Sequence, residues 1–210
     1  MLPLSVDLAR LRVLLIGEGA AALRRLELLD EAGARDLAVY AERPAPALAR
    51  RAGDRLRRRL PSSAELAAAR LVFLSDRGAA TTPGLAATAR AAGALVHVED
   101  APALSDLQAP AVLRRGGLTI AVSTGGASPG LAVQVKRFLG RLFGPEWGDR
   151  LDSLAALRQD WRRSGADAAT LAQRTEAWIE RQGWLPREAE DEFNAPGRRV
   201  ARSGSAAAPH

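Results

Sequence analysis

The sequence has 210 residues and a formal net charge of +6, and its 26% charged residues are ordinary for a globular protein. It has no cysteine and only two histidines, which excludes disulfides, thiolate zinc sites, cysteine nucleophiles and multi-histidine metal cages. The basic balance favours a polyanionic partner, but no RNA-binding signature accompanies it and no apolar run approaches the roughly 18 residues of a membrane span. We therefore expect a cytoplasmic protein with no resident metal and no nucleic-acid or membrane partner.

Short apolar runs alternate with helical segments along the first part of the chain. The runs predict buried strands at residues 12–16, 37–41, 70–74, 94–98 and 118–122. Helical composition between them predicts helices at residues 20–32, 45–58 and 82–92. This alternation favours an α/β fold with a Rossmann-like parallel sheet covering about residues 1–112.

The texture of the sequence changes after Pro129. Three further helices are predicted over residues 130–143, 149–162 and 168–182. From Pro186 the chain is first charged and then rich in Gly, Ser and Ala, so residues 189–210 are expected to be disordered. The four arginines at 55 and 57–59 fit either a solvated face or a ligand-facing cluster.

The first strand is followed at once by a glycine motif. Residues 17–22 read GEGAAA, which fits the pattern G-x-G-x-x-[GA] between a strand and a helix. In such a turn Gly17 permits the tight bend, Gly19 lets the backbone approach a pyrophosphate, and Ala22 allows close helix packing. The helix N-terminus attracts the phosphates. The motif predicts a dinucleotide site, and the alternative is a tight turn that binds nothing.

A charged pair stands at the end of the second strand. Glu42 is placed to accept hydrogen bonds from the ribose hydroxyls of NAD, whereas Arg43 beside it could favour the 2′-phosphate of NADP. We expect NAD, because Glu42 would repel an added phosphate. A charged pair in a solvated turn is the alternative interpretation.

Three segments in this order resemble the precorrin-2 dehydrogenase family, which includes the N-terminal module of siroheme synthase and its stand-alone relatives. Residues 2–19 read LPLSVDLARLRVLLIGEG, residues 96–102 read VHVEDAP, and residues 110–132 read PAVLRRGGLTIAVSTGGASPGLA. The resemblance covers about residues 2–185, and the STGGASP stretch is its most specific element.

The resemblance implies NAD-dependent oxidation of precorrin-2 to sirohydrochlorin, in siroheme and cobalamin biosynthesis. Some members of the family also act as lyases that insert ferrous iron to make siroheme. It further implies a homodimer built from an NAD-binding domain (1–112), a dimerisation and tetrapyrrole-site region (113–145), a helical domain (146–188) and a tail (189–210).

The resemblance also assigns roles by position. Gly17 and Gly19, together with Ala20 and Ala21, would hold the pyrophosphate, and Glu42 and Arg43 occupy the adenosine side. Asp100 matches the aspartate that serves as general base and is implicated in chelation, and Ser128 matches a serine of the tetrapyrrole loop. Taken from sequence alone, Asp100 could instead cap a turn, and Ser128 could cap the helix that follows it.

A tetrapyrrole substrate with eight carboxylates would explain the net positive charge of the chain. Arg114 and Arg115, in the segment that carries the resemblance, are candidates for a cationic rim that binds the substrate. Each of these arginines, taken alone, fits a solvated surface position equally well.

Several positions depart from the family pattern near the expected clefts. They are Ser75 and Arg77 after the third strand, Thr82 and His97 where asparagine is common, and Gln108 in a stretch that is usually aromatic-rich. These departures keep two alternatives open. One is a chelatase that lacks hydride transfer, and the other is a non-catalytic regulator that binds NAD or a tetrapyrrole.

Overall fold

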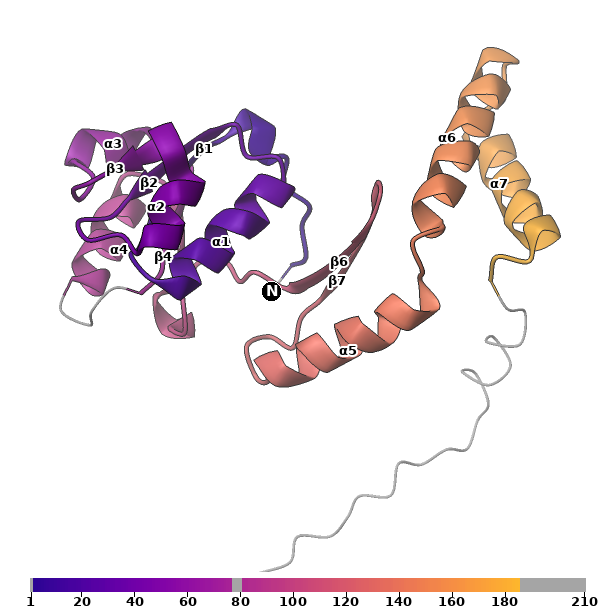
Figure 1. Ribbon diagram of the computed structural model, residues 1–210. Coiled ribbons are helices and arrows are strands. Elements are labelled where there is room, and N and C mark those ends of the chain that lie inside the picture. The colour runs from indigo at the N-terminus through magenta and orange to yellow at the C-terminus, as the bar shows by residue number, and fades with distance from the viewer. Residues whose placement is uncertain (1, 77–80, 186–210) are drawn as a thin grey trace, which may run out of the picture. The chain divides into compact units, whose positions relative to one another are not determined.

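The computed structural model describes residues 2–76 and 81–185 (Figure 1). Its strands are β1 (Arg12–Ile16), β2 (Asp36–Tyr40), β3 (Leu56–Arg57), β4 (Leu71–Leu74), β5 (Leu95–Val98), β6 (Ala111–Arg115) and β7 (Leu118–Val122). Its α-helices are α1 (Ala20–Glu31), α2 (Pro46–Ala52), α3 (Ser63–Ala68), α4 (Thr82–Ala91), α5 (Pro129–Leu142), α6 (Trp147–Arg163) and α7 (Ala168–Gln182).

The first five strands form one parallel sheet in the order β3-β2-β1-β4-β5. The chain winds outward from β1 to β3, then returns to β4 on the other side of β1, so the strand order reverses between β1 and β4. Ligands of open α/β sheets bind at such a reversal, beyond the carboxyl ends of the strands. The predicted α/β, Rossmann-like fold class is confirmed.

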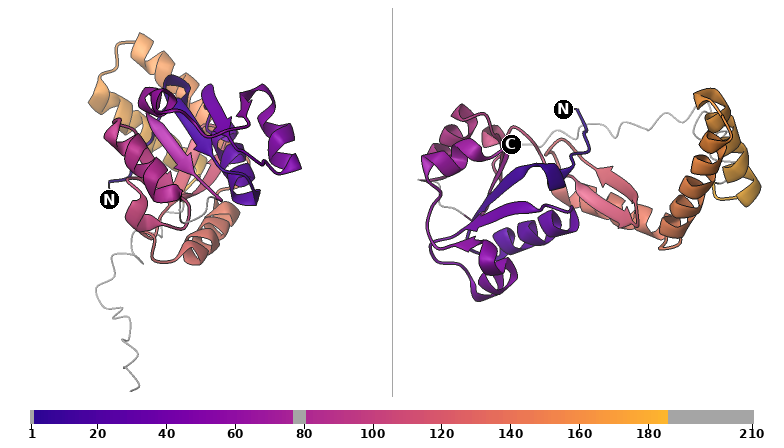
Figure 2. Two further views of the ribbon diagram at one scale, coloured as in Figure 1. Left: turned by 90° about the vertical axis from the view of Figure 1, so that its left-hand side faces the viewer. Right: turned by 90° about the horizontal axis from the view of Figure 1, so that it is seen from above.

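Helices cover both faces of this sheet (Figure 2). On one face α1 and α2 pack on alternate strand residues such as Val13 and Leu15, and on the other α3 and α4 pack on Leu14 and Ile16. All four of these strand side chains have no exposed surface. Burial on both faces explains why the strands read as continuous apolar runs.

Two predictions about this region differ from the structure. The helix expected over 45–58 ends at Ala52, and the chain then extends into β3, whose Arg57 carbonyl accepts a hydrogen bond from Ala41 N at 3.0 Å. The strand expected over 118–122 is present as β7, but it pairs with β6 in a separate two-stranded sheet. The segment between β5 and β7 contains no α-helix, so it cannot form the crossover that would bring β7 into the parallel sheet.

By its contacts the chain divides into two units. The first consists of residues 1–114 and 119–143, and the second of residues 115–118 and the chain from Gly144 onward. In the second unit α6 packs on α7, and Arg158 donates hydrogen bonds to the Leu171 carbonyl and the Thr175 hydroxyl. The four-part division of the sequence stays a prediction, and its expected disordered tail lies outside the described residues.

Among the residues that the structure describes, no helix is long and apolar enough to cross a membrane. The sequence left open whether the arginines at 55 and 57–59 face solvent or a ligand. Arg55 and Arg59 form ion pairs with acids of the same chain. Arg55 binds Asp30 at 2.5 Å and Arg59 binds Glu65 at 2.7 Å. Arg57 donates instead to the backbone carbonyls of Asp54 and Leu56.

Gly116 → Ala should destabilise the second unit by about 2 kcal/mol, because φ is +54° at this turn and an added Cβ would lie 3.0 Å from the Gly148 backbone. Gly117→Ala is the matched control, since its Cβ would meet only the flexible Leu151 side chain, at 3.2 Å. Urea unfolding followed by tryptophan fluorescence measures both. Equal losses of stability in the two variants would contradict this account of the turn.

Candidate functional site

Gly17 lies where the ends of β1, β2 and β4 come together. Its N–H donates to the Tyr40 carbonyl at 3.0 Å. A Cβ at this position would lie 2.4 Å from the Ser75 carbonyl oxygen and 2.8 Å from the Ala22 Cβ. Those distances are shorter than any van der Waals contact, and the nearest obstacle is backbone, so only glycine fits here.

The N-terminus of α1 follows directly after this turn. Gly19 is its N-cap residue, and Ala20 and Ala21 begin the first turn, whose N–H groups have no carbonyl partner within the helix. Together with the helix dipole, such amides bind phosphate groups well. The turn therefore fits a dinucleotide pyrophosphate, which these residues would hold through backbone amides.

In the structure Asp76 occupies part of this position. Its Oδ2 accepts hydrogen bonds from Gly19 N at 3.1 Å and from Ala22 N at 2.8 Å. Asp76 follows β4 and has a φ of +55°, a conformation that is uncommon for residues other than glycine. The carboxylate thus interacts with the same helix end as an incoming phosphate.

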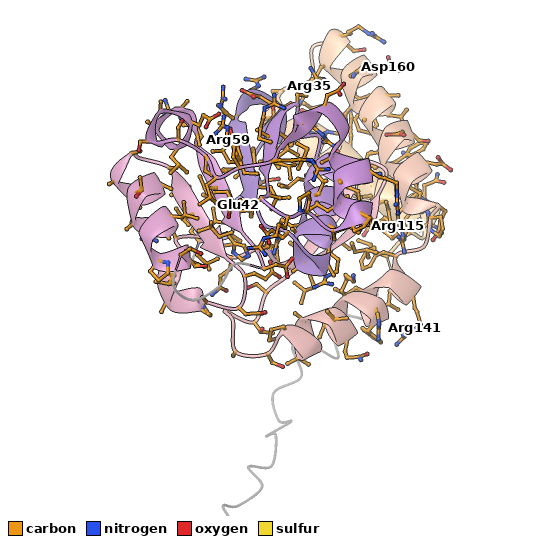
Figure 3. The ribbon with its side chains drawn as sticks, turned by 60° about the vertical axis from the view of Figure 1, so that its left-hand side comes forward. Arg35, Glu42, Arg59, Arg115, Arg141 and Asp160 are labelled. Carbon is orange, nitrogen blue, oxygen red and sulfur yellow. The ribbon has the colours of Figure 1, made fainter. Side chains whose placement is uncertain are left out.

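Glu18 connects the glycine turn to the end of β2. Its Oε1 accepts hydrogen bonds from the backbone N–H groups of Glu42 and Arg43, both at 3.1 Å, and its carbonyl accepts one from Ala45 N. The side chains of Glu42 and Arg43 are exposed, and Glu42 is labelled in Figure 3. Glu18 therefore adds a second carboxylate on the side where Glu42 was predicted to meet the adenosine.

A cluster of polar side chains lies behind the site, between α1 and β5. Arg25 of α1 donates to Glu99 Oε2 at 2.8 Å and lies 3.1 Å from Nε2 of His97. Arg25 and His97 are each 9% exposed. Because arginine can only donate, Nε2 of His97 accepts, and its Nδ1 carries the proton that the Leu107 carbonyl accepts at 3.1 Å.

Charge pairing in this cluster lowers the pKa of Glu99 to about 2. The causes are His97, whose Nε2 is 3.8 Å from Glu99 Oε2 and attracts its charge when the ring is protonated, and the Arg25 guanidinium, which is both closer and permanently charged. Partial burial opposes the shift, since it favours the neutral acid. Glu99 is therefore ionised at neutral pH, and its charge is balanced by Arg25.

Asp100 stands next to Glu99, in the turn after β5, and its side chain is exposed. Its φ is +56°, a region that aspartate and asparagine enter more readily than most other residues. Its position beyond the carboxyl end of a parallel strand matches the usual place of functional groups in this fold. The structure thus puts Asp100 at the same edge of the sheet as the glycine turn.

A pocket of about 280 Å³ opens at this edge. Its lining includes two acidic side chains, Asp76 and Glu99, and its other residues are mainly apolar: Leu74, Thr82, Pro83, Val98, Ala101 and Leu104. Thr82, one of the departures from the family pattern, is buried at the start of α4, and Ser75 is buried at the end of β4. Arg77 lies outside the described residues.

The remaining predicted residues lie further along the chain. Ser128 is the N-cap of α5, and its hydroxyl accepts from Leu131 N at 3.3 Å. Arg114 of β6 donates to the Thr119 hydroxyl of β7 at 3.2 Å, and Arg115, labelled in Figure 3, is its neighbour on the strand. Adjacent strand residues point to opposite faces, so these two arginines do not face the same way.

Sequence reasoning missed three contributors to the site: Glu18, Asp76 and the pairing of Arg25 with Glu99. An acid between the two glycines of the motif was a visible signal for Glu18. The contacts of Asp76 with Gly19 and of Arg25 with Glu99 join residues that are 57 and 74 positions apart. No local pattern in the sequence predicts such pairs.

The fold and the glycine turn define a Rossmann-type dinucleotide-binding protein. A family model described as "Putative NAD(P)-binding" matches residues 4–111, and one described as "Sirohaem biosynthesis protein central" matches residues 115–142. The chain therefore belongs to the family described as putative NAD(P)-binding, and both matches agree with its resemblance to precorrin-2 dehydrogenases.

Curated relatives carry the name siroheme synthase. The protein of Methylococcus capsulatus is 34% identical over 78% of this chain, and that of Gluconobacter oxydans is 33% identical over 96% of it. The chain spans only 35% and 41% of their respective lengths. The solved structure of SirC, a precorrin-2 dehydrogenase, has the same fold, with a TM-score of 0.69, 22% identity and coverage of 92% of this chain and 96% of that one.

Glu99→Gln should lower stability at pH 7 by about 2 kcal/mol, because Arg25 keeps a buried charge without its partner. The wild type should also lose stability as pH falls from about 4.5 to about 2, since the unfolded chain takes up the Glu99 proton before the folded one does. Glu99→Gln should lack this part of the pH dependence. Urea unfolding at several pH values measures it, with the exposed Glu27→Gln as control. Parallel stability curves for wild type and Glu99→Gln would refute the pairing.

Proposed function

We propose that this chain is an NAD-dependent precorrin-2 dehydrogenase, which oxidises precorrin-2 to sirohydrochlorin in siroheme biosynthesis. The observation that carries the proposal is the order of two features in one chain. A glycine turn that fits a pyrophosphate lies at the strand-order reversal, and the STGGASP loop that contains Ser128 follows within the segment matched by the sirohaem family model. The names of the relatives support the same activity.

The proposed reaction removes a hydride and a proton from precorrin-2. NAD, when bound, supplies the hydride acceptor. Asp100 is the proposed general base, because it is an exposed carboxylate at the edge of the sheet that carries the glycine turn. Glu99 is less suited to this role, since Arg25 stabilises its ionised form and lowers its basicity.

A preference for NAD over NADP is part of the proposal. Glu42 would accept hydrogen bonds from the adenosine ribose, and Glu18 brings a second carboxylate to the same loop by binding its backbone amides. Two carboxylates would repel the extra phosphate of NADP. The exposed Arg43 is the one opposing charge that the sequence places beside Glu42.

The proposed tetrapyrrole substrate is a polycarboxylate, for which cationic side chains are natural partners. Since Arg114 and Arg115 point to opposite faces of β6, a single substrate would meet only one of them from a given protomer. Ser128 would act through its position at the N-terminus of α5. Insertion of ferrous iron, a cytoplasmic location and a homodimer complete the proposal.

Asp100→Asn should reduce dehydrogenation by about 10²-fold or more, the usual scale for loss of a general base. Asparagine keeps the size and tolerates the +56° φ, so the fold should be unchanged. The assay is anaerobic incubation with precorrin-2, with and without NAD, followed by absorbance, and iron insertion is measured separately.

Asp100→Ala is a poorer test of this role, because alanine at a positive φ costs about 1 kcal/mol on backbone grounds alone. A folded, fully active Asp100→Asn enzyme would remove Asp100 from its catalytic role. A wild-type protein that makes siroheme from sirohydrochlorin but leaves precorrin-2 unchanged would instead favour the chelatase alternative.

Light scattering at micromolar concentration should give the mass of a homodimer. On α5, Leu131, Phe138 and Leu142 are each more than half exposed, and their spacing of seven and four residues puts them on one helix face. Phe138→Glu should therefore weaken the dimer. Arg137→Gln changes the charge by the same amount about 100° around the helix and should not. A wild-type monomer would contradict the proposed assembly.

A further inference from the structure

The hydrogen bonds of Asp76 raise a question about the dinucleotide turn. One carboxylate oxygen accepts from both Gly19 N and Ala22 N, at 3.1 and 2.8 Å, and so interacts with the start of α1 from outside the helix. Asp76 is itself exposed, and its backbone has a φ of +55°. An added Cβ on Gly19 would lie 3.1 Å from the same carboxylate oxygen.

These contacts have the chemistry of a bound anion. A helix N-terminus presents N–H groups and a partial positive charge, and it stabilises one negative group placed against them. Because the pyrophosphate of a dinucleotide would approach the same turn, the carboxylate and the phosphates repel each other and compete for its amides.

We propose that Asp76 is an internal competitor for the cofactor, and that its carboxylate leaves the amides of α1 when a dinucleotide pyrophosphate takes them. This inference rests on the proposed dinucleotide binding. The observed affinity for the cofactor is then reduced by the fraction of molecules in which Asp76 occupies the turn. Asp76 thereby raises the cofactor concentration that is needed to fill the site, although it does not itself bind the cofactor.

The test is calorimetric titration of the full chain with NAD. Asp76→Gly removes the carboxylate while tolerating the positive φ, and should bind NAD about tenfold more tightly than the wild type, the scale of a helix-cap interaction. Asp76→Asn keeps an oxygen acceptor but loses the charge, so its affinity should fall between the two. Asp36→Asn, an exposed carboxylate at the start of β2 and thus at the opposite edge of the sheet, is the control for net charge and should match the wild type.

Thermal unfolding gives a second readout that does not depend on activity. Without cofactor, Asp76→Gly should melt at a lower temperature than the wild type, because α1 has lost its cap. Saturating NAD should narrow this difference in melting temperature, since a phosphate then replaces the carboxylate. If Asp76 were only a structural cap, the difference in melting temperature would be the same with and without NAD.

The outcomes separate this inference from the proposed function. If the wild type binds NAD and the two Asp76 variants bind it equally or more weakly, the competition is refuted and the dinucleotide site stands. If Asp76→Gly does not fold, the affinity of Asp76→Asn relative to Asp36→Asn decides the question. If neither the wild type nor any variant binds NAD or NADP, the proposed dinucleotide binding fails together with the inference.

Discussion

The absence of a side chain at Gly17 is the constraint on which the arrangement of this site depends. With a Cβ only 2.4 Å from the Ser75 carbonyl, β1 could not turn into α1 so close to the end of β4. The close approach places the N-terminus of α1 at the reversal of strand order. The backbone amides of the helix therefore lie at the edge of the sheet where β4 and β5 also end.

Two side chains from the ends of β4 and β5 help to hold α1 in this position. Asp76, after β4, accepts hydrogen bonds from the first turn of the helix, and Glu99, after β5, pairs with Arg25 in its second turn. The helix is thus connected to both neighbouring strand ends by charged groups. The two adjacent acids after β5 therefore differ in their surroundings: Glu99 is paired with Arg25, whereas Asp100 is exposed.

Sequence patterns identified the elements whose signals are local. Continuous apolar runs predicted β1, β2, β4 and β5, and the glycine motif placed its turn correctly. The two-residue β3 and the six-residue α3 were missed, because such short elements carry too little periodicity. The β6 strand was missed since each of its residues is at best half-buried, which blurs the alternation of apolar and polar side chains. Asp76 and the Arg25 cluster were missed because their contacts are made only by the folded chain.

The cluster of Arg25, His97 and Glu99 has a consequence for how this sequence can change over time. One terminal nitrogen of the buried Arg25 guanidinium meets both a carboxylate and an imidazole nitrogen, so the loss of any one member costs stability by leaving an unmatched charge or lone pair. Substitutions at these three positions are therefore expected to arise together, along lineages that abandon the whole set. A relative that carries asparagine in place of His97 must solve the packing between α1 and β5 by other means, so its first helix is the place to look for the compensating residue.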